Sequence, residues 1–141
     1  MPETTGAYAA KCMLSAIEGS GVTPREVGAV NTHGTATRKG DLAEVLAMKA
    51  VFDGEPPPFS STKSMTGHPL GAAGALEAIF CVAMLEQNFI APSINIEILD
   101  PVFEGLPIIT TPNSTELTTI LSNSFGFGGT NASLLLGAVR T

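Results

Sequence analysis

The sequence is poor in the residue types that mark nucleic-acid and metal-binding proteins. Its 141 residues include no tryptophan, one tyrosine, two cysteines and two histidines, with seven Lys or Arg against thirteen Asp or Glu. The net charge of −6 argues against binding to a nucleic-acid backbone, which requires clustered cations. Charged residues make up only 14% of the chain. We therefore expect another subunit, or a missing part of the same protein, to cover some apolar surface.

The cysteines and the apolar segments carry little functional signal. Cys12 and Cys81 lie in apolar helical patterns without the spacing of a zinc site, which favours buried, inert thiols. The first residues lack the basic region and apolar core of a signal peptide. The apolar run over 71–85 is too short for a membrane span and carries Glu77. We expect a soluble, cytoplasmic protein with neither membrane nor nucleic-acid partners.

The expected elements indicate one α/β domain over residues 1–141. Apolar residues at helical spacing predict helices over 10–17, 41–52 and 71–87. The second is expected to begin at Asp41, because Asp41 with Glu44 three residues later is typical of a helix start. Apolar and β-branched runs predict short strands at 28–31, 59–62, 108–109, 118–122 and 132–136. The order α-β-α-β-α-β-β-β indicates a mixed sheet with layered helices that ends in antiparallel strands.

The two histidines, His33 and His68, occupy matching positions in the sequence. Each follows a short expected strand, lies beside a glycine and precedes an expected helix. The C-terminal ends of strands are where α/β folds gather their reactive groups. Neutral imidazoles there could donate N–H groups to a developing oxyanion, as enolate-forming enzymes require. A zinc site is the rival interpretation, but two histidines without a nearby cysteine or carboxylate set make a poor ligand set.

Lys63 and Glu77 have two interpretations. Glu77 interrupts a helix rich in Gly, Ala and Leu, where burial of an acid is costly without a cationic partner. An ion pair with Lys63 would satisfy both charges and fix the loop that carries His68. Alternatively, Lys63 is a solvated charge and Glu77 lies on the exposed stripe of an amphipathic helix. The pattern alone leaves both interpretations open.

The turn Phe125-Gly126-Phe127-Gly128-Gly129 is a further candidate. Its glycines permit positive φ and can expose backbone N–H groups to an oxyanion or a phosphate. The alternative is a hairpin turn whose two aromatic side chains pack on the core. A dinucleotide-binding loop is disfavoured, since the third glycine is not at the required spacing and no helix follows.

Three segments together resemble the elongating β-ketoacyl-acyl-carrier-protein synthases of the thiolase superfamily: Asn-Thr-His-Gly-Thr-Ala-Thr, Ser-Thr-Lys-Ser-Met-Thr-Gly-His-Pro-Leu-Gly-Ala-Ala-Gly and Ser-Asn-Ser-Phe-Gly-Phe-Gly-Gly-Thr-Asn. The resemblance covers nearly the whole chain and implies the C-terminal half of a two-half thiolase fold. It also implies that the nucleophilic cysteine lies in an absent N-terminal half. The first strand of this half, central in its sheet, is expected before Met1.

The resemblance implies a role for individual residues. His33 and His68 match the pair that holds the malonyl thioester oxygen, and Lys63 with Glu77 matches an ion pair that organises the site. The remaining matches are the pantetheine-binding hydroxyls of Thr35 and Thr37, the oxyanion N–H of Phe127, an acyl gate of Phe125 and Phe127, an acid behind the first histidine at Asp41, and a monovalent-cation site at Asn31, Glu77, Ser122 and Asn123. No cofactor is implied beyond the phosphopantetheine of the acyl carrier protein that delivers the substrate.

The implied function is decarboxylative condensation of malonyl-acyl carrier protein with an acyl-enzyme thioester in fatty acid elongation. The acyl carrier protein, the N-terminal half and a second copy in a homodimer are the expected partners, and the isolated chain is expected to be inactive. A degradative thiolase is disfavoured because it needs a second cysteine in the turn after Ser124. An initiating ketosynthase is disfavoured because it has Asn where His68 stands. A non-catalytic scaffold, such as a chain-length partner or a dimerisation fragment, is the alternative from another class.

Overall fold

The computed structural model describes residues 5–139. The elements that build the sheet and its covering layers are α1 (Ala7–Gly19), β1 (Ala29–Asn31), α2 (Arg38–Val51), β2 (Phe59–Ser60), α3 (Lys63–Thr66), α4 (Ala73–Gln87), β5 (Thr119–Phe125) and β6 (Asn131–Gly137). A separate two-stranded sheet pairs β3 (Phe89–Ile90) with β4 (Asn113–Ser114). Short 3-10 turns occupy Pro24–Glu26, Leu70–Ala72, Pro101–Phe103 and Phe127–Gly129.

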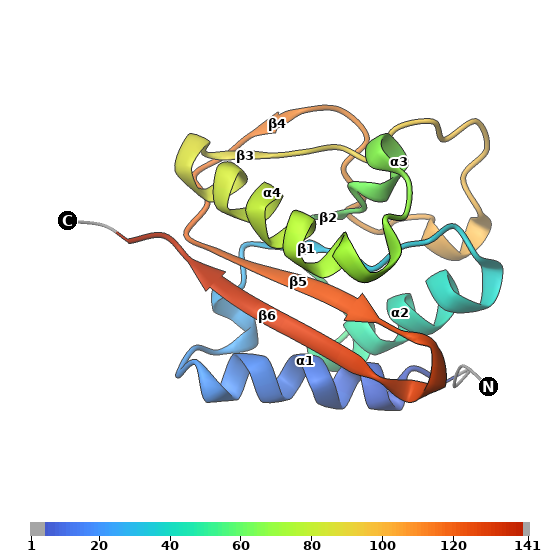
Figure 1. Ribbon diagram of the computed structural model, residues 1–141, viewed down its shortest axis with the longest axis horizontal. Coiled ribbons are helices and arrows are strands. Elements are labelled where there is room, and N and C mark those ends of the chain that lie inside the picture. The colour runs from blue at the N-terminus through green and yellow to red at the C-terminus, as the bar shows by residue number, and fades with distance from the viewer. Residues whose placement is uncertain (1–4, 140–141) are drawn as a thin grey trace.

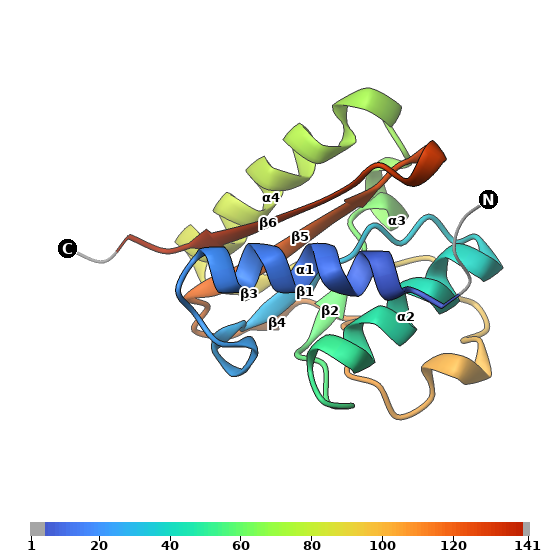
Figure 2. The same ribbon diagram turned by 90° about the horizontal axis from the view of Figure 1, so that it is seen from below.

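The main sheet has the strand order β2-β1-β5-β6. Strand β1 pairs in parallel with both β2 and β5, whereas β6 runs antiparallel to β5 over its whole length. Helices α1 and α2 cover one face of this sheet and α4 covers the other (Figures 1 and 2). The result is a three-layer α/β/α arrangement, so the expected mixed sheet with layered helices and antiparallel C-terminal strands is confirmed.

The core divides into two clusters, one on each face of the sheet. Val30 and Leu121 pack with the apolar sides of α1 and α2, whereas Ala29 and Ile120 pack with α4. Successive residues of a strand point to opposite faces, which is why neighbours on β1 and β5 enter different clusters. Burial on both faces explains why the successive β1 residues Ala29 and Val30 are both apolar.

Several expectations about individual elements were wrong. Helix α2 begins at Arg38 with Thr37 as its N-cap, three residues before Asp41, because the backbone amide of Asp41 already bonds the Thr37 carbonyl at 2.9 Å. Residues 108–109 form only an isolated bridge from Ile108 to Phe59, and the short strands β3 and β4 lacked a signal in the sequence. Within the described residues the sheet has no gap, since β1 bonds directly to β5. A further strand therefore cannot be central and has room only at an edge.

The apolar segment around α4 is longer than its sequence suggested. The 3-10 turn at Leu70–Ala72 leads directly into α4, so the segment Leu70–Gln87 is by length and composition alone sufficient to cross a membrane. The expectation that this apolar run is too short for a membrane span is therefore wrong. The helix nevertheless packs on β5 and β6 and buries a charged residue, Glu77, as the core helix of a layered domain does.

Candidate active site

The two histidines meet at the edge of the sheet formed by the carboxyl ends of its parallel strands, not at a lateral edge strand. His33 follows β1 by two residues, and α3, which follows β2, leads to His68. Because β1 and β2 are parallel, their carboxyl ends lie at the same edge, on the side where α2 and α3 begin (Figure 1). The two imidazole rings pack edge to face with their centroids 5.5 Å apart and an interplanar angle of 84°. The topology thus brings together two residues that only matched by local pattern in the sequence.

The environment of His33 favours the neutral imidazole. Burial, followed by the charges of Lys63 and His68, lowers its pKa to about 4. The Phe125 ring lies 5.9 Å from the His33 ring, centroid to centroid, and supplies an apolar wall. The Nδ1 atom of His33 is buried and has no hydrogen-bond partner among residues 5–139. A neutral ring at pH 7 can donate one N–H group to an oxyanion without carrying a positive charge.

The orientation of the exposed His68 ring is set by its own loop. Its Nδ1 accepts a hydrogen bond from the backbone N–H of Leu70 at 3.2 Å. In a neutral imidazole an accepting Nδ1 leaves the proton on Nε2, so Nε2 is the donor that remains for a ligand. Leu70 holds a positive φ of 52°, a costly conformation for a bulky residue. This strained loop fixes the tautomer of His68.

Lys63 and Glu77 form a buried ion pair. The Nζ atom of Lys63 lies 2.8 and 2.9 Å from the two carboxylate oxygens of Glu77, and the two side chains are 4% and 2% exposed. The interpretation as an ion pair is therefore confirmed, and that of an exposed stripe is wrong. The pair joins α3 to α4, and the Lys63 ammonium lies near enough to His33 to help lower the pKa of that imidazole.

The expected cation-site residues separate into two groups. The Asn31 Nδ2 atom lies 3.4 Å from Glu77 Oε1 and 3.3 Å from Ser122 Oγ, so these three side chains share one polar cluster. The side chain of Asn123 points to the opposite face of β5 and donates to Glu44 at 3.1 Å. Clusters of three or more His, Cys, Asp or Glu side chains that could hold a metal are absent from the described part of the chain.

Glu44 is a site residue that the sequence analysis missed. Its buried carboxylate accepts hydrogen bonds from the backbone amides of His33 at 2.9 Å and Gly34 at 3.0 Å, in addition to the one from Asn123. Burial raises its pKa, and these three bonds oppose the rise. Its position within the apolar stripe of α2, beside Val45 and Met48, is the same signal that singled out Glu77. Because Glu44 also fits the pattern of an acid in the first turn of a helix, its position on the buried side of α2 was not recognised from the sequence.

Asp41 lies nearby but has a different role from Glu44. Burial raises its pKa, partly offset by the backbone amides of Ala36 and Thr35, and its Oδ1 atom is buried without a hydrogen-bond partner within residues 5–139. It therefore supports the loop that follows His33, whereas Glu44 bonds the His33 backbone directly. The acid that bonds behind the first histidine is Glu44.

The loops that carry the two histidines touch through Ser61. Its Oγ donates to the Gly34 carbonyl at 2.7 Å. Gly34 has a φ of 27°, and a Cβ atom there would lie 2.7 Å from the Cβ of Ser61 and from the Oγ1 of Thr32. Only glycine permits this close approach of the two loops.

The remaining expected residues line the outer part of the same edge. The hydroxyls of Thr35 and Thr37 lie 3.2 Å apart and are within hydrogen-bonding reach of each other. Phe125 ends β5 beside His33, whereas the Phe127 side chain is fully exposed in the glycine-rich turn. Two of the glycines in that turn, Gly128 and Gly129, have positive φ, as expected of a tight turn. The structure thus places Phe125 at the histidines and Phe127 out in solvent.

The cysteines offer no nucleophile at this edge. Cys81 is fully buried on α4, and burial raises the pKa of its thiol to about 11, so it is not a thiolate at neutral pH. Cys12 is half-buried on α1.

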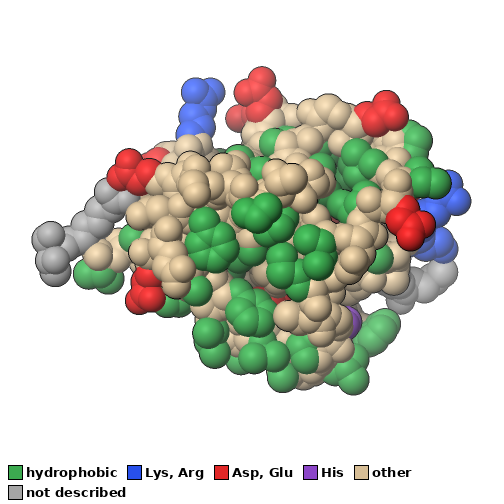
Figure 3. All heavy atoms as spheres, turned by 90° about the horizontal axis from the view of Figure 1, so that it is seen from above, with side chains coloured by type: hydrophobic (Ala, Val, Ile, Leu, Met, Phe, Trp, Pro, Cys, Tyr) green, Lys and Arg blue, Asp and Glu red, His purple; other side chains and the backbone are tan. Residues whose placement is uncertain are grey.

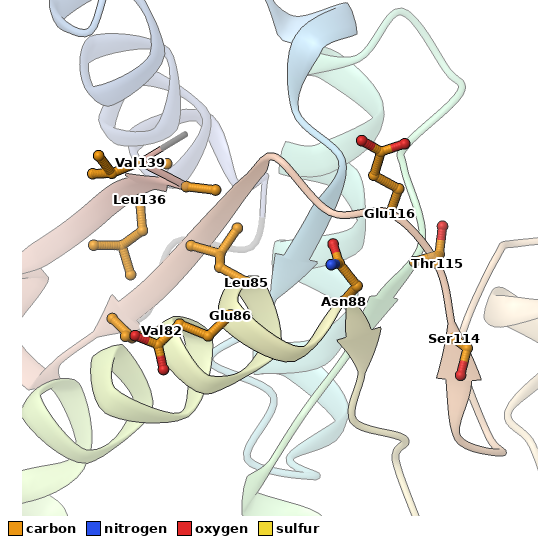
Figure 4. Close-up of a pocket in the computed structure, with 11 residues that line it drawn as sticks. Val82, Leu85, Glu86, Asn88, Ser114, Thr115, Glu116, Leu136 and Val139 are labelled. Carbon is orange, nitrogen blue, oxygen red and sulfur yellow. The ribbon is translucent and has the colours of Figure 1, made fainter. Parts of the chain in front are cut away.

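A large hollow lies at the opposite end of the molecule from the histidines. It has a volume of about 950 Å³ and lies between the C-terminal ends of α4 and β6 and the strand β4. Figure 4 shows the apolar side chains of Val82, Leu85, Leu136 and Val139 on one side, with Glu86 beside Val82, and the polar side chains of Asn88, Ser114, Thr115 and Glu116 on the other. It is remote from the groups that could do chemistry.

Comparisons with known proteins define the family. Residues 1–97 match the model of the β-ketoacyl synthase C-terminal domain. The chain is 52% identical over 140 residues to 3-oxoacyl-acyl-carrier-protein synthase 1 of Escherichia coli, covering 99% of this chain and 34% of that protein. The chain therefore belongs to the β-ketoacyl synthase family and carries its C-terminal domain. It spans about a third of the length of the curated relatives that it matches.

Solved structures agree with this assignment. A β-ketoacyl synthase from Burkholderia phymatum superposes with a TM-score of 0.92 at 39% identity, over 99% of this chain and 34% of that one. A ketosynthase determined with its type II polyketide synthase acyl carrier protein, and bound to a hexaketide, matches with a TM-score of 0.92 at 31% identity, over 98% and 34% of the two chains. The thiolase-like fold expected from the sequence is confirmed.

Proposed function

We propose that this chain is the malonyl-binding, C-terminal part of an elongating β-ketoacyl-acyl-carrier-protein synthase of fatty acid synthesis that acts in the cytoplasm. The observation that carries the proposal is the pair of imidazoles, His33 and His68, in contact above a buried Lys63–Glu77 ion pair. This arrangement supplies two imidazole N–H donors beside a buried ammonium group, whose charge helps to keep His33 neutral.

The proposed chemistry is a decarboxylative Claisen condensation. The bond between the malonyl carboxylate and its methylene carbon breaks, CO2 leaves, and the electron pair moves onto the thioester oxygen to form an enolate. Neutral His33 and the Nε2–H of His68 hydrogen-bond that oxygen, and preorganised donors aimed at developing charge lower the barrier. The enolate carbon then attacks an acyl thioester on a cysteine elsewhere in the protein. A carbon–carbon bond forms and the cysteine thiolate departs.

The outer residues are proposed to handle the carrier arm and the acyl group. The hydroxyls of Thr35 and Thr37 are close together in an exposed part of the site, so they could hydrogen-bond the amide groups of a phosphopantetheine arm. The backbone N–H of Phe127 is proposed as an oxyanion donor, and the side chains of Phe125 and Phe127 as a gate. The cluster of Asn31, Glu77 and Ser122, with only the backbone of Asn123 available beside it, is the proposed place of a monovalent cation. No cofactor is proposed beyond the substrate-bearing arm of the acyl carrier protein.

The cysteine and the acyl side are proposed to lie in an N-terminal part of the same protein, in a homodimer. The outward side of α4 supports this proposal because Leu76, Ile79 and Val82 are 38%, 63% and 43% exposed on a helix whose other side is already buried. Figure 3 shows apolar side chains gathered on this face of the molecule. An apolar helix exposed along one side is typical of an interface that has lost its partner. The strand expected before Met1 would join an edge of the sheet, since its interior is closed.

Reconstitution tests the function. The purified chain alone should neither condense acyl and malonyl carriers nor extend an acyl group. Co-expression with the N-terminal two thirds of a cysteine-containing relative should restore malonyl decarboxylation, measured as CO2 release, and condensation. In the reconstituted enzyme, His33→Asn and His68→Asn should each lower decarboxylation at least tenfold, whereas Glu104→Gln, an exposed control, should not. Robust condensation by the isolated chain, or full activity of the reconstituted enzyme with both histidines replaced, would contradict the proposal.

A further inference from the structure

A short segment after α4 returns to hold the loop that carries Lys63 and His68. This segment, residues 91–95, will be called the strap. Its carbonyl at Ala91 accepts from Ser60 Oγ at 2.6 Å, and its Ser93 Oγ accepts from the backbone N–H of Ser61 at 2.9 Å. The strap is thus bonded to the two residues that lead from β2 into α3.

The last two strap residues bond Ser64, in the first turn of α3. The backbone N–H of Ile94 donates to Ser64 Oγ at 2.9 Å, and the Asn95 Nδ2 donates to the Ser64 carbonyl at 2.9 Å. The same Ser64 hydroxyl donates to the Ser61 carbonyl at 2.8 Å. Helix α3 has only four residues, so it cannot hold its own position by helical bonding and depends on such external contacts.

The strap also connects to the loop of the first histidine. Ser61, held through its backbone N–H by Ser93, donates through its hydroxyl to the Gly34 carbonyl next to His33. One continuous set of hydrogen bonds therefore runs from the strap through Ser61 to the His33 loop, and from Asn95 through Ser64 to the helix that carries Lys63.

Asn95 adopts a backbone conformation that only a few residue types accept readily. Its φ is 61°, in the left-handed region, where Asn is tolerated better than most non-glycine residues. It is exposed, so burial does not account for this conformation. In this conformation the side-chain amide of Asn95 points at the Ser64 carbonyl and donates a hydrogen bond to it.

We propose that Asn95 is a positioning residue of this site: through Ser64 it holds α3, and with it Lys63 and His68, against the loop of His33. Its catalytic consequence rests on the proposed function, but its geometric consequence does not. Releasing the amide loosens α3, increases the distance between the two imidazoles and admits water to His33.

Histidine NMR on the whole 141-residue chain tests the geometric consequence, because the sequence has only two histidines to resolve. The variant Asn95→Gly keeps the positive φ and removes the amide. The matched control is Ile98→Gly, which adds the same backbone freedom at a position of the same loop that is 90% exposed. The His33 signal is assigned with the variant His33→Asn. Its pH titration reports the burial of His33 and its distance from Lys63 and His68. The nearby acids of α2, Asp41 and Glu44, are present in every variant.

We expect Asn95→Gly to raise the pKa of His33 by at least one unit from its value of about 4, and Ile98→Gly to leave it in place. Asn95→Asp, which keeps the shape but lacks the Nδ2 donor, should act like Asn95→Gly. An unchanged His33 titration in both folded Asn95 variants would overturn the proposal. So would unfolding of both while Ile98→Gly stays folded, because the strap would then support the whole domain.

Activity provides a second, separate readout. In the reconstituted enzyme, Asn95→Gly should lower kcat for malonyl decarboxylation about tenfold with little change in KM, since the arm-binding threonines are untouched. An altered His33 titration together with an inactive reconstituted wild type would leave the positioning role standing and overturn the proposed function instead. A changed KM with unchanged kcat would overturn the positioning role.

Discussion

The imidazole rings of His33 and His68 meet edge to face with their centroids 5.5 Å apart, although each belongs to a loop after a different strand. Two sets of hydrogen bonds from side chains to the backbone support this contact. Glu44 bonds the amides of His33 and Gly34, and Ser61 bonds the Gly34 carbonyl from the second loop. These contacts make the geometry of the pair sensitive to particular substitutions and to pH.

The first prediction concerns the stability of the fold between pH 4 and 6.5. Burial, then Lys63 and His68, lower the pKa of His33 to about 4, whereas an unfolded chain has a histidine pKa of about 6.5. Between these values the unfolded state binds more protons. The His33 contribution is therefore complete above pH 6.5 and is lost as the pH falls toward 4. We expect a loss of about 2 kcal/mol, after allowance for solvent screening of a half-buried ring, measured by urea unfolding at stepped pH.

A control variant isolates this effect from two acids that act in the opposite direction. Burial raises the pKa of Glu44 and of Asp41, so their contributions are present below the ordinary carboxyl pKa and are lost as the pH rises. His33→Asn should remove only the histidine component. Parallel stability curves for the wild type and His33→Asn across pH 4 to 6.5 would contradict a neutral, buried His33.

The second prediction concerns the Lys63–Glu77 pair. Lys63→Met leaves a buried carboxylate without its cation and should cost about 3–5 kcal/mol of unfolding free energy. The double variant Lys63→Met/Glu77→Leu should recover most of that loss, because no unpaired charge remains. Chemical denaturation of both variants and of Glu86→Gln, an exposed acid of the same helix, provides the measurement. Equal stability of Lys63→Met and Glu86→Gln would show that the pair is not buried.

The third prediction separates Glu44 from Asp41. Glu44→Gln turns an acceptor of three hydrogen bonds into a group that faces backbone amides with its own N–H donors, and we expect a cost of about 2–4 kcal/mol. Asp41→Asn should cost about 1 kcal/mol, since one of its carboxylate oxygens has no partner within the described residues. Thermal and urea unfolding of the two variants rank them. The reverse ranking would assign the support of the His33 loop to Asp41.

The fourth prediction concerns the approach of the two histidine loops at Gly34. Gly34→Ala introduces a Cβ at 2.7 Å from Ser61 Cβ, so we expect a cost of about 3 kcal/mol and separation of the two imidazoles. Gly54→Ala, at a φ of 86° with open space around it, is the control for backbone strain alone and should cost about 1 kcal/mol. Ser61→Gly in the Gly34→Ala background should recover part of the difference. Equal costs for the two alanine variants would rule out a steric limit at Gly34.

Much of the fold could be predicted because its signals are local. The helical spacing of Ala10, Met13 and Ile17 placed α1, and all three are buried. The start of α2 could not be placed, since Asp41 and Glu44 form a pattern typical of a helix start although both lie inside the helix. The two-residue strands β3 and β4 are held by their pairing with each other, and such a contact has no local pattern to read.

The sequence by itself determined the family, the fold class and the candidate pair of histidines, because the glycine and threonine residues around them form long, specific motifs. Only the tertiary structure decided which acids serve those histidines. Glu77 and Glu44 are both buried, but one neutralises Lys63 while the other binds backbone amides. It also decided that the side chain of Asn123 bonds Glu44 and does not join Ser122. Adjacent residues of a strand point to opposite faces, and which face meets which helix is set by packing between segments far apart in the chain.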